Sequence, residues 1–202
     1  IPPPPRLTWK PDFSVLRVAA RIGVPAGLQG VLLNLAGLSL FAFMRMLEHS
    51  AAAQAAYTIC YSQLFSFVTF ASMGLRSAAA TVVGQNLGAE KPHRARRGVY
   101  VAVSMGVGWS ILLGLVYWNL APELLAIFDV TDPNEFAFAQ SLLRYLALSG
   151  VAISAALAFT GGLQGSGDTL KPLIIAFISQ IGILLGVCTV FRSLDALTAS
   201  RI

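Results

Sequence analysis

Five long runs without a charged residue constrain this chain more than any other feature of its sequence. A helix needs about 20 apolar residues to cross the roughly 30 Å hydrocarbon core of a bilayer, and each run reaches about that length. Only 11% of the residues are charged, against about a quarter in soluble domains. The sequence therefore predicts an all-α membrane protein with about five transmembrane helices. The predicted spans are residues 22–44, 51–75, 98–121, 145–163 and 172–191.

The residues outside these spans predict a topology. Residues 1–21 begin with a run of prolines, which is typical of a stiff, extended linker, and residues 192–202 form a short polar tail that cannot span. One side of the membrane would carry Arg6, Lys10, Arg17, Arg21, Arg76, Lys91, Arg94, Arg96, Arg97 and Lys171, and the other only Arg45, Arg144, Arg192 and Arg201. Because basic residues favour the cytoplasmic side, we expect a multi-pass protein of the cell membrane with a cytoplasmic N-terminus and an external loop at residues 123–135.

Small residues recur on single faces of four predicted helices. Membrane helices associate through such faces because small side chains let two backbones approach closely. The sequence therefore predicts a compact bundle. The four faces are Gly23, Gly27, Gly30, Asn34 and Gly37; Gly106, Ser110 and Gly114; Gly150, Ser154, Ala158 and Gly162; and Gly182 and Gly186.

The second predicted helix instead carries a stripe of hydroxyl side chains that leads to Arg76; its members are Thr58, Ser62, Ser66, Thr69 and Ser72. These hydroxyls either line a cavity or bond back to their own helix. Asn34 in the first helix either bonds to a neighbouring helix or contacts the cavity. Pro25 either lies in the first turn of its helix, where it is tolerated, or kinks a helix that begins earlier. The candidate cavity residues are Gln29, Asn34, Tyr57, Thr58, Tyr61, Ser62 and Ser66.

No Asp, Glu, Lys, Arg or His lies inside the five predicted spans. Ion-coupled transport usually needs an ionisable group within the membrane, so a coupling carboxylate is expected outside this chain. Cys60, Cys188, His49 and His93 lack metal-ligand spacing, and we expect no metal, no cofactor and no enzyme active site. A nucleic-acid site at residues 91–97 is a weaker interpretation than a basic loop beside the membrane.

Two glycine-containing motifs follow predicted helices on the same side of the membrane. Residues 74–89 contain Arg76, Gly84, Gln85 and Gly88, and residues 161–172 contain Gly165, Gly167, Asp168 and Pro172. Gly88 and the pair Gly165 and Gly167 would allow chain reversals. Asp168 or Thr169 would cap the last predicted helix, with Pro172 in its first turn. A tight, rigid junction explains each motif without a ligand.

Together with Gly23-Val-Pro25, these motifs resemble those of the multidrug and toxic compound extrusion (MATE) family. The first motif matches at Arg76, Gly84, Gln85, Leu87, Gly88 and Ala89. The second matches at Gly161, Gly165, Gly167, Asp168, Thr169 and Pro172. Gln164 departs from the family pattern, in which many members have Arg. The resemblance covers roughly residues 12–190.

The resemblance implies a two-lobe, twelve-helix antiporter that exports drugs or toxic organic compounds in exchange for protons or sodium ions. This chain would be most of the second lobe, apparently incomplete. The coupling ion would bind in the missing first lobe, and the other partners would be small organic substrates and the lipid bilayer. Two alternatives remain open. One is a flippase of lipid-linked precursors from the same superfamily, and the other is a non-transporting membrane subunit.

Overall fold

The computed structural model describes residues 13–45, 50–130, 132–183, 186 and 189–190. Its regular elements are all helical. They are α1 (Phe13–Met44), α2 (Ser50–Tyr57), the π-helix η1 (Thr58–Leu64), α3 (Ser66–Gly88), α4 (Pro92–Asn119), α5 (Ala121–Ile127), α6 (Pro133–Gly165), α7 (Leu170–Phe177) and the π-helix η2 (Ile178–Ile183).

Length and apolar composition confirm the predicted membrane class. Within the part of the chain that the structure describes, four helices are long and apolar enough to cross a bilayer: α1, α3, α4 and most of α6. A shorter apolar helix covers Leu170–Gln180; it begins two residues before the fifth predicted span and overlaps it. The end of that span falls partly, and the predicted tail wholly, outside the described residues.

The helices extend beyond the predicted bounds. Helix α1 begins at Phe13, so residues 13–21 of the predicted linker are helical; residues 1–12 lie outside the described part. Helix α3 continues through Arg76 to Gly88, and α6 begins twelve residues before its predicted span, at Pro133. At these three bounds the prediction stopped beside Arg21, Arg76 and Arg144. A charged side chain does not end a helix, because its long stem lets the charged group reach a polar environment.

The second predicted span is not one uniform helix. The π-helix η1 separates α2 from α3, and the backbone N–H of Phe65 donates to the carbonyl of Cys60, five residues earlier, at 2.8 Å. The hydroxyl of Tyr117 in α4 donates to the carbonyl oxygen of Leu64 at 2.6 Å. A wide turn leaves carbonyls without their usual helical partners, and Tyr117 satisfies one of them.

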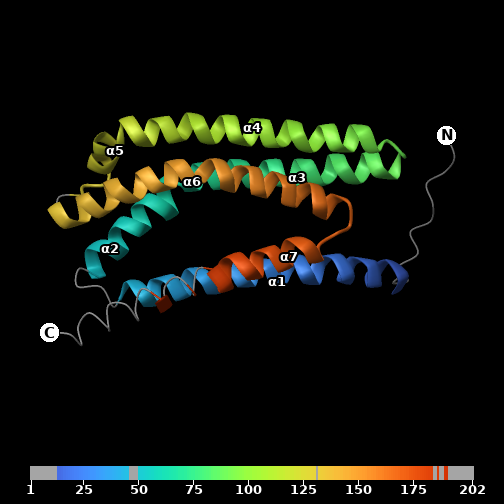
Figure 1. Ribbon diagram of the computed structural model, residues 1–202, viewed down its shortest axis with the longest axis horizontal. Helices are drawn as coiled ribbons and strands as arrows, with labels where there is room; N and C mark the ends of the chain where they lie inside the picture. Colours follow the sequence, from blue (N-terminus) through green and yellow to red (C-terminus); the bar gives the residue numbers. More distant parts are fainter. Residues whose placement is uncertain (1–12, 46–49, 131, 184–185, 187–188, 191–202) are drawn as a thin grey trace, which may run out of the picture.

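The long helices form two groups (Figure 1). We call α3, α4 and α6 the main bundle; the three helices pack against one another along their length. Helices α1 and α7 lie side by side as a second group, the α1–α7 pair, and α2 connects α1 to the main bundle. The start of α1, the α3–α4 turn and the α6–α7 turn lie at one end of the molecule, and α5 lies at the other.

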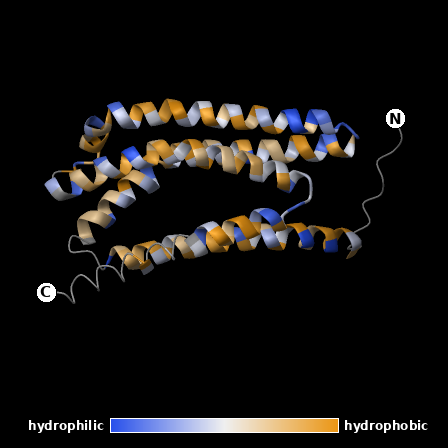
Figure 2. Ribbon diagram, in the orientation of Figure 1, coloured by the Kyte–Doolittle hydropathy of each residue, from blue (hydrophilic) through white to orange (hydrophobic). Residues whose placement is uncertain are grey.

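Side-chain size changes along the main bundle. Near α5 the core contains large buried side chains, including Phe65, Leu125 and Leu143. Toward the α3–α4 turn it is built from Ala79, Ala102 and Ala158. Small residues allow close helix contact, so the α3–α4 turn end is the more closely packed. Figure 2 shows apolar residues along the helices and polar ones at that turn.

Two of the four predicted packing faces are confirmed. A Cβ added at Gly114 in α4 would lie 3.2 Å from the carbonyl oxygen of Ala147 in α6, and one at Gly150 in α6 would lie 2.7 Å from the Ser110 hydroxyl. Within the described residues, nothing lies within 4 Å of such a Cβ on the glycines of α1 or at Gly182 and Gly186. The predicted faces of α1 and the last helix are therefore open in this structure.

Candidate substrate-facing site

A cluster of three polar side chains connects the two groups of helices. The Arg76 Nε and one terminal guanidinium nitrogen, from α3, donate to Gln164 Oε1 of α6 at 3.1 and 3.0 Å. The same terminal nitrogen donates to Gln29 Oε1 of α1 at 3.3 Å, and Gln164 Nε2 donates to Gln29 Oε1 at 3.2 Å. Both predicted motifs and the first helix therefore meet at one point.

Neutral partners surround the Arg76 charge. Its three hydrogen bonds among the described residues end on amide oxygens, and the ion pair found in the same part of the chain lies elsewhere, between Lys171 and Asp168. The guanidinium keeps its positive charge, so the cluster is a cationic site that amides hold in place. A pocket of about 320 Å³ lies beside it, lined by Met73, Arg76, Ser77, Ala80 and Gln164.

Glycines of the second motif bring Arg76 and Gln164 together. A Cβ at Gly161 would overlap the carbonyl oxygen of Arg76, and one at Gly165 would overlap that of Ala80. Helices α3 and α6 therefore touch backbone to backbone on both sides of Gln164. One turn before Arg76, the hydroxyls of Ser72 and Ser154 lie 2.7 Å apart, and both side chains are buried. This contact fixes the two helices immediately beside the cluster.

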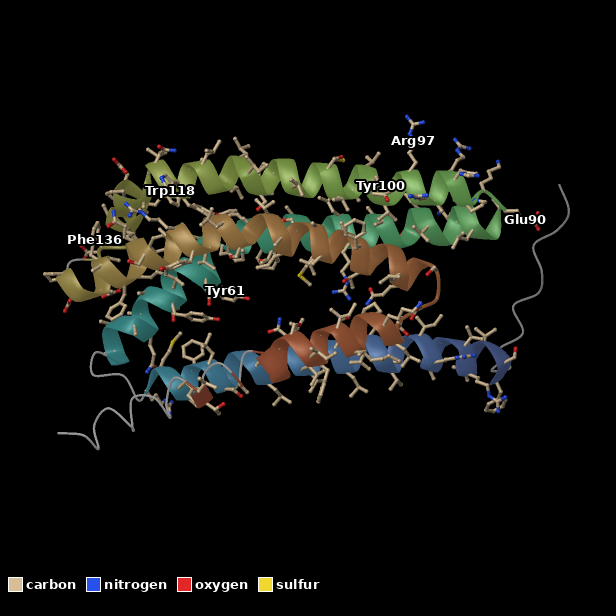
Figure 3. The ribbon with its side chains drawn as sticks, in the orientation of Figure 1. Tyr61, Glu90, Arg97, Tyr100, Trp118 and Phe136 are labelled. Carbon is tan, nitrogen blue, oxygen red and sulfur yellow. The ribbon has the colours of Figure 1, made fainter. Side chains whose placement is uncertain are left out.

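Predicted cavity residues Tyr57 and Tyr61 belong to a separate aromatic group. Their rings stack with centroids 5.0 Å apart; Tyr57 meets Phe41 of α1 edge to face at 5.2 Å, and Tyr61 stacks on Phe65 at 5.8 Å. Phe65 is fully buried, whereas Tyr61 is 42% exposed and lies on the side of the main bundle that faces α1 (Figure 3). Tyr61 and Arg76 are 15 residues apart along one helical stretch, or roughly 20 Å.

Most of the predicted hydroxyl stripe bonds back to its own helical stretch. Thr58 donates to the carbonyl of Gln54 at 2.8 Å, and Ser66 donates to that of Gln63. Ser62 is exposed. Ser72 donates to the carbonyl of Val68 at 2.7 Å and also pairs with Ser154 of α6. The structure thus brings part of the stripe into helix contact instead of into one continuous polar surface.

The structure bears on the alternatives left open for two residues of α1. The Asn34 amide donates to the carbonyl of Gly30 in its own helix at 2.9 Å and is exposed, so no bond to a neighbouring helix is found among the described residues, and a contact with the cavity stays a prediction. Backbone bonding satisfies the donor locally. Pro25 lies inside α1, not in its first turn, and it cannot donate to the carbonyl of Arg21.

The first junction also differs from expectation. Gly84 packs near the second motif, since a Cβ there would lie 3.5 Å from the Gly165 carbonyl oxygen. Gln85 is exposed, and its carbonyl accepts a bond from the Ala89 N–H at 3.1 Å. The chain reversal uses a positive φ of 58° at Glu90 and not at Gly88, because α3 ends at Gly88, Ala89 caps it, and the turn falls at the next residue.

The second junction follows its prediction more closely. Gly167 has a φ of 85°, a conformation that favours glycine, whereas Gly165 serves close packing instead of reversal. Asp168 Oδ1 accepts a hydrogen bond from the Lys171 N–H at 3.2 Å and thereby caps α7. The Lys171 side chain lies 2.7 Å from Asp168 Oδ2, and its hydrogen bond holds the pKa of the Asp168 carboxyl below its usual value.

The sequence did not assign a role to Gln164, yet this residue holds Arg76 in place. The sequence did contain one sign that Gln164 has a role. It is an amide between two packing glycines, at a position where the family resemblance leads one to expect Arg. With Gln at this position, the side chain can accept hydrogen bonds from Arg76, which a second guanidinium cannot do. Among the described residues, no group of three or more His, Cys, Asp or Glu could hold a metal ion.

These features define an integral, multi-pass α-helical membrane protein whose helices pack through small residues and are connected by a partly buried polar cluster. The MatE family model matches residues 25–190, which is more than half of the 202 residues. The chain belongs to the MatE family, as its motifs suggested.

Several curated proteins are similar to this chain. It is 32% identical over 195 residues to the probable multidrug resistance protein NorM of Mesorhizobium japonicum, an alignment that covers 91% of this chain and 40% of that protein. The multidrug export protein MepA of Staphylococcus haemolyticus is 27% identical over 94% of this chain and 40% of its own length. The probable multidrug resistance protein YoeA of Bacillus subtilis is 23% identical, covering 86% and 37%. The chain thus spans about two fifths of these relatives.

Proposed function

We propose that the protein to which this chain contributes exports drugs or other toxic organic compounds across the cell membrane, in exchange for protons or sodium ions. Membership of the MatE family supports a transporter and not an enzyme. The relatives reported above are named for multidrug resistance or export, and none of these names supports the flippase alternative. Within this protein the chain would form most of one lobe.

One observation carries the choice of substrate: the aromatic group at the α1–α2 contact. Flat apolar rings accept many organic shapes, and a tyrosine face also attracts organic cations. Tyr61 is the partly exposed member of the stack, and Phe65 anchors the stack in the core. We place the substrate surface on this side of the main bundle, toward the α1–α7 pair, with Tyr57, Tyr61 and Ser62 among its residues.

The Arg76 cluster lies roughly 20 Å further along the same helical stretch and would position helices. It connects α1 to the main bundle through Gln29, and its charge would disfavour a cationic compound beside it. In this proposal Gln29 acts as a connection between helices, and the coupling ion binds to a carboxylate outside this chain.

The proposal is tested with cells that lack their own drug exporters and express the complete protein. We expect Tyr61→Ala to reduce the efflux of lipophilic cationic dyes about tenfold, the loss of roughly 1.4 kcal/mol of binding. Tyr145→Ala is the matched control, because Tyr145 is 71% exposed on α6. Equal efflux by both variants would contradict the substrate surface. Failure of the complete protein to export any compound against a proton or sodium gradient would contradict the function itself.

Orientation belongs to the same proposal: N-terminus, residues 90–97 and residues 165–171 inside, and residues 123–135 outside. The uneven distribution of basic residues supports it. Single cysteines are placed at Pro92 and Asp132 after Cys60 and Cys188 are replaced by alanine. In intact cells, an impermeant thiol reagent should label the cysteine at Asp132 and leave the one at Pro92 unmodified; the reverse pattern would invert the orientation.

A further inference from the structure

A groove of about 600 Å³ runs along the outer side of the contact between α3 and α4. Its floor is made by Ala79 and Ala102, which are 1% and 6% exposed. At Gly98 a Cβ would lie 2.5 Å from Val82 Cγ1, so the two helices close the floor there. The other lining residues are Leu75, Ala78, Val82, Asn86, Arg94, Arg97, Gly98, Val101 and Met105.

The two ends of this groove differ in charge. The end at Leu75 and Met105 is apolar. The other end holds Asn86, Arg94 and Arg97, and the α3–α4 turn beside it carries Glu90 and Lys91. Arg97 reaches outward from α4 near that turn, where Glu90 also lies (Figure 3). The ion pair found among the described residues involves neither groove arginine.

The length of the groove matches one leaflet of a bilayer. From Arg94 to Met105 the helix rises about 16 Å, at 1.5 Å for each residue, which is about half of a 30 Å hydrocarbon core. The charged end lies next to a turn, where lipid headgroups are found, and the apolar end lies near mid-membrane. A partner helix that crosses the whole membrane would extend far beyond such a groove.

We propose that this groove binds one anionic phospholipid. Its phosphate is held by Arg94 and Arg97, and one acyl chain lies over Ala79 and Ala102 as far as Met105. Basic pockets between membrane helices at the headgroup level suit phosphate groups, and arginine is well matched to phosphate oxygens. The inference depends on membrane insertion and not on the proposed transport function.

A matched pair of arginine variants tests the headgroup site. The purified chain in a neutral detergent is mixed with equal amounts of phosphatidylglycerol and phosphatidylcholine, and the retained lipids are counted by native mass spectrometry. Near an anionic lipid surface each arginine contributes about five- to sixfold in affinity. We therefore expect the Arg94→Gln, Arg97→Gln double variant to lower the preference for phosphatidylglycerol roughly 30-fold.

The control is Arg96→Gln. Arg96 has the same charge on the same helix but is absent from the groove lining, and its guanidinium donates to the Tyr100 hydroxyl at 3.4 Å. It should leave the preference within about twofold of the unmodified chain, because it does not contact the phosphate. An equal loss in Arg96→Gln and the double variant, or equal retention of both lipids by the unmodified chain, would overturn the proposal.

Two further variants test the acyl-chain site and avoid the buried floor. Val101→Phe adds bulk at an exposed lining position and should reduce phosphatidylglycerol retention, whereas Ile111→Phe, at an exposed position of α4 outside the lining, should not.

Trp109 lies one turn beyond Met105, and its indole N–H donates to the Phe67 carbonyl at 3.2 Å. With Trp9 and Trp118 changed to phenylalanine, phosphatidylglycerol brominated along its acyl chain should quench Trp109, and less so in Val101→Phe. Absence of quenching in the parent chain would contradict the placement of the acyl chain.

Discussion

The main bundle and the α1–α7 pair are both built from apolar, glycine-containing helices, yet they pack in different ways. In α6, 33% of the most apolar 18-residue window is buried within the structure, against 11% in α1. Glycines of α6 meet the α3 backbone directly, whereas no described atom lies within 4 Å of a Cβ on the glycines of α1. Helix α1 reaches the main bundle through the polar contacts of Gln29 with Arg76 and Gln164, and it meets α2 through the aromatic contact of Phe41 with Tyr57.

This difference shows that a face of small residues permits close packing without causing it. The small faces of α4 and α6 become buried because complementary partners, such as Ser110 opposite Gly150, lie at the same depth. The glycine face of α1 has the required spacing but no such partner among the described residues. In lipid there is no hydrophobic force to press two such faces together. Whether a small-residue face becomes buried therefore depends on the helix that faces it.

The largest expected effect comes from a glycine-to-alanine change, made once in the main bundle and once in the α1–α7 pair. Gly161→Ala should destabilise the chain by about 3 kcal/mol, because its Cβ would overlap the Arg76 carbonyl oxygen and overpacking typically costs 1–3 kcal/mol or more. Gly27→Ala, at an open position of α1, should change stability by less than about 1 kcal/mol. Unfolding in mixed detergent micelles measures both, and equal values would remove the distinction between the two groups.

Removing the acceptor of Arg76 should have the next largest effect. Gln164→Leu leaves a half-buried guanidinium without its main partner, which should cost about 1.5–3 kcal/mol. Gln29→Leu removes one of the three bonds from Arg76 and should cost about 1 kcal/mol. Gln85→Leu is the control, since its exposed side chain forms none of the hydrogen bonds found among the described residues. If Gln29→Leu proved the more damaging, α1 would contribute more to the cluster than this geometry indicates.

A double-mutant cycle on Ser72 and Ser154 sharpens the description of the main bundle. Hydrogen bonds between membrane helices average about 0.6 kcal/mol in such cycles, and we expect this coupling for the Ser72→Ala and Ser154→Ala pair, whose hydroxyls lie 2.7 Å apart. The control pair is Ser39 and Ser104, which bond to their own helices at 2.9 Å each and should show no coupling. A coupling near zero for both pairs would mean that the buried hydroxyls do not connect α3 to α6.

The smallest effect concerns the cap where α6 leads into the α1–α7 pair. Because Lys171 lowers the pKa of Asp168, the charged carboxylate favours the folded junction at neutral pH. This contribution is lost as the pH falls through the lowered pKa. Amide hydrogen exchange at Lys171, corrected for its intrinsic pH dependence, should then lose protection at acidic pH. Asp168→Asn keeps the Oδ1 acceptor but cannot titrate, so its protection at Lys171 should not change with pH. A pH response in that variant equal to that of the unmodified chain would assign the effect to another group.

The sequence predicted the helical membrane class and the α4 and α6 packing faces because both depend on local patterns. A repeat of four residues, as in Gly106, Ser110 and Gly114, places side chains on one face in any helix. The same rule placed Ser72 in line with Arg76. These features do not require knowledge of which helix lies next to which.

Contacts between distant residues could not be predicted in this way. Arg76 and Gln164 are 88 positions apart, and no local pattern indicates that two amides, one of them on α1, would share one guanidinium. The amide of Asn34 had a backbone acceptor in its own helix, and the sequence pattern cannot decide between that acceptor and one on a neighbouring helix. The π-helix η1 was not predicted, because over so few residues its side-chain periodicity resembles that of an ordinary α-helix.

The wide turn at Thr58–Leu64 also has a geometric consequence. Each residue of an α-helix turns the chain by about 100°, since 3.6 residues complete a circle. Because a wide turn holds one residue more than an α-helical turn, Tyr57 is offset by about that angle around the axis, relative to Ser72, from its direction in a continuous α-helix. The wide turn thus sets the direction in which Tyr57 faces, while Phe65 at the start of α3 stays buried in the core.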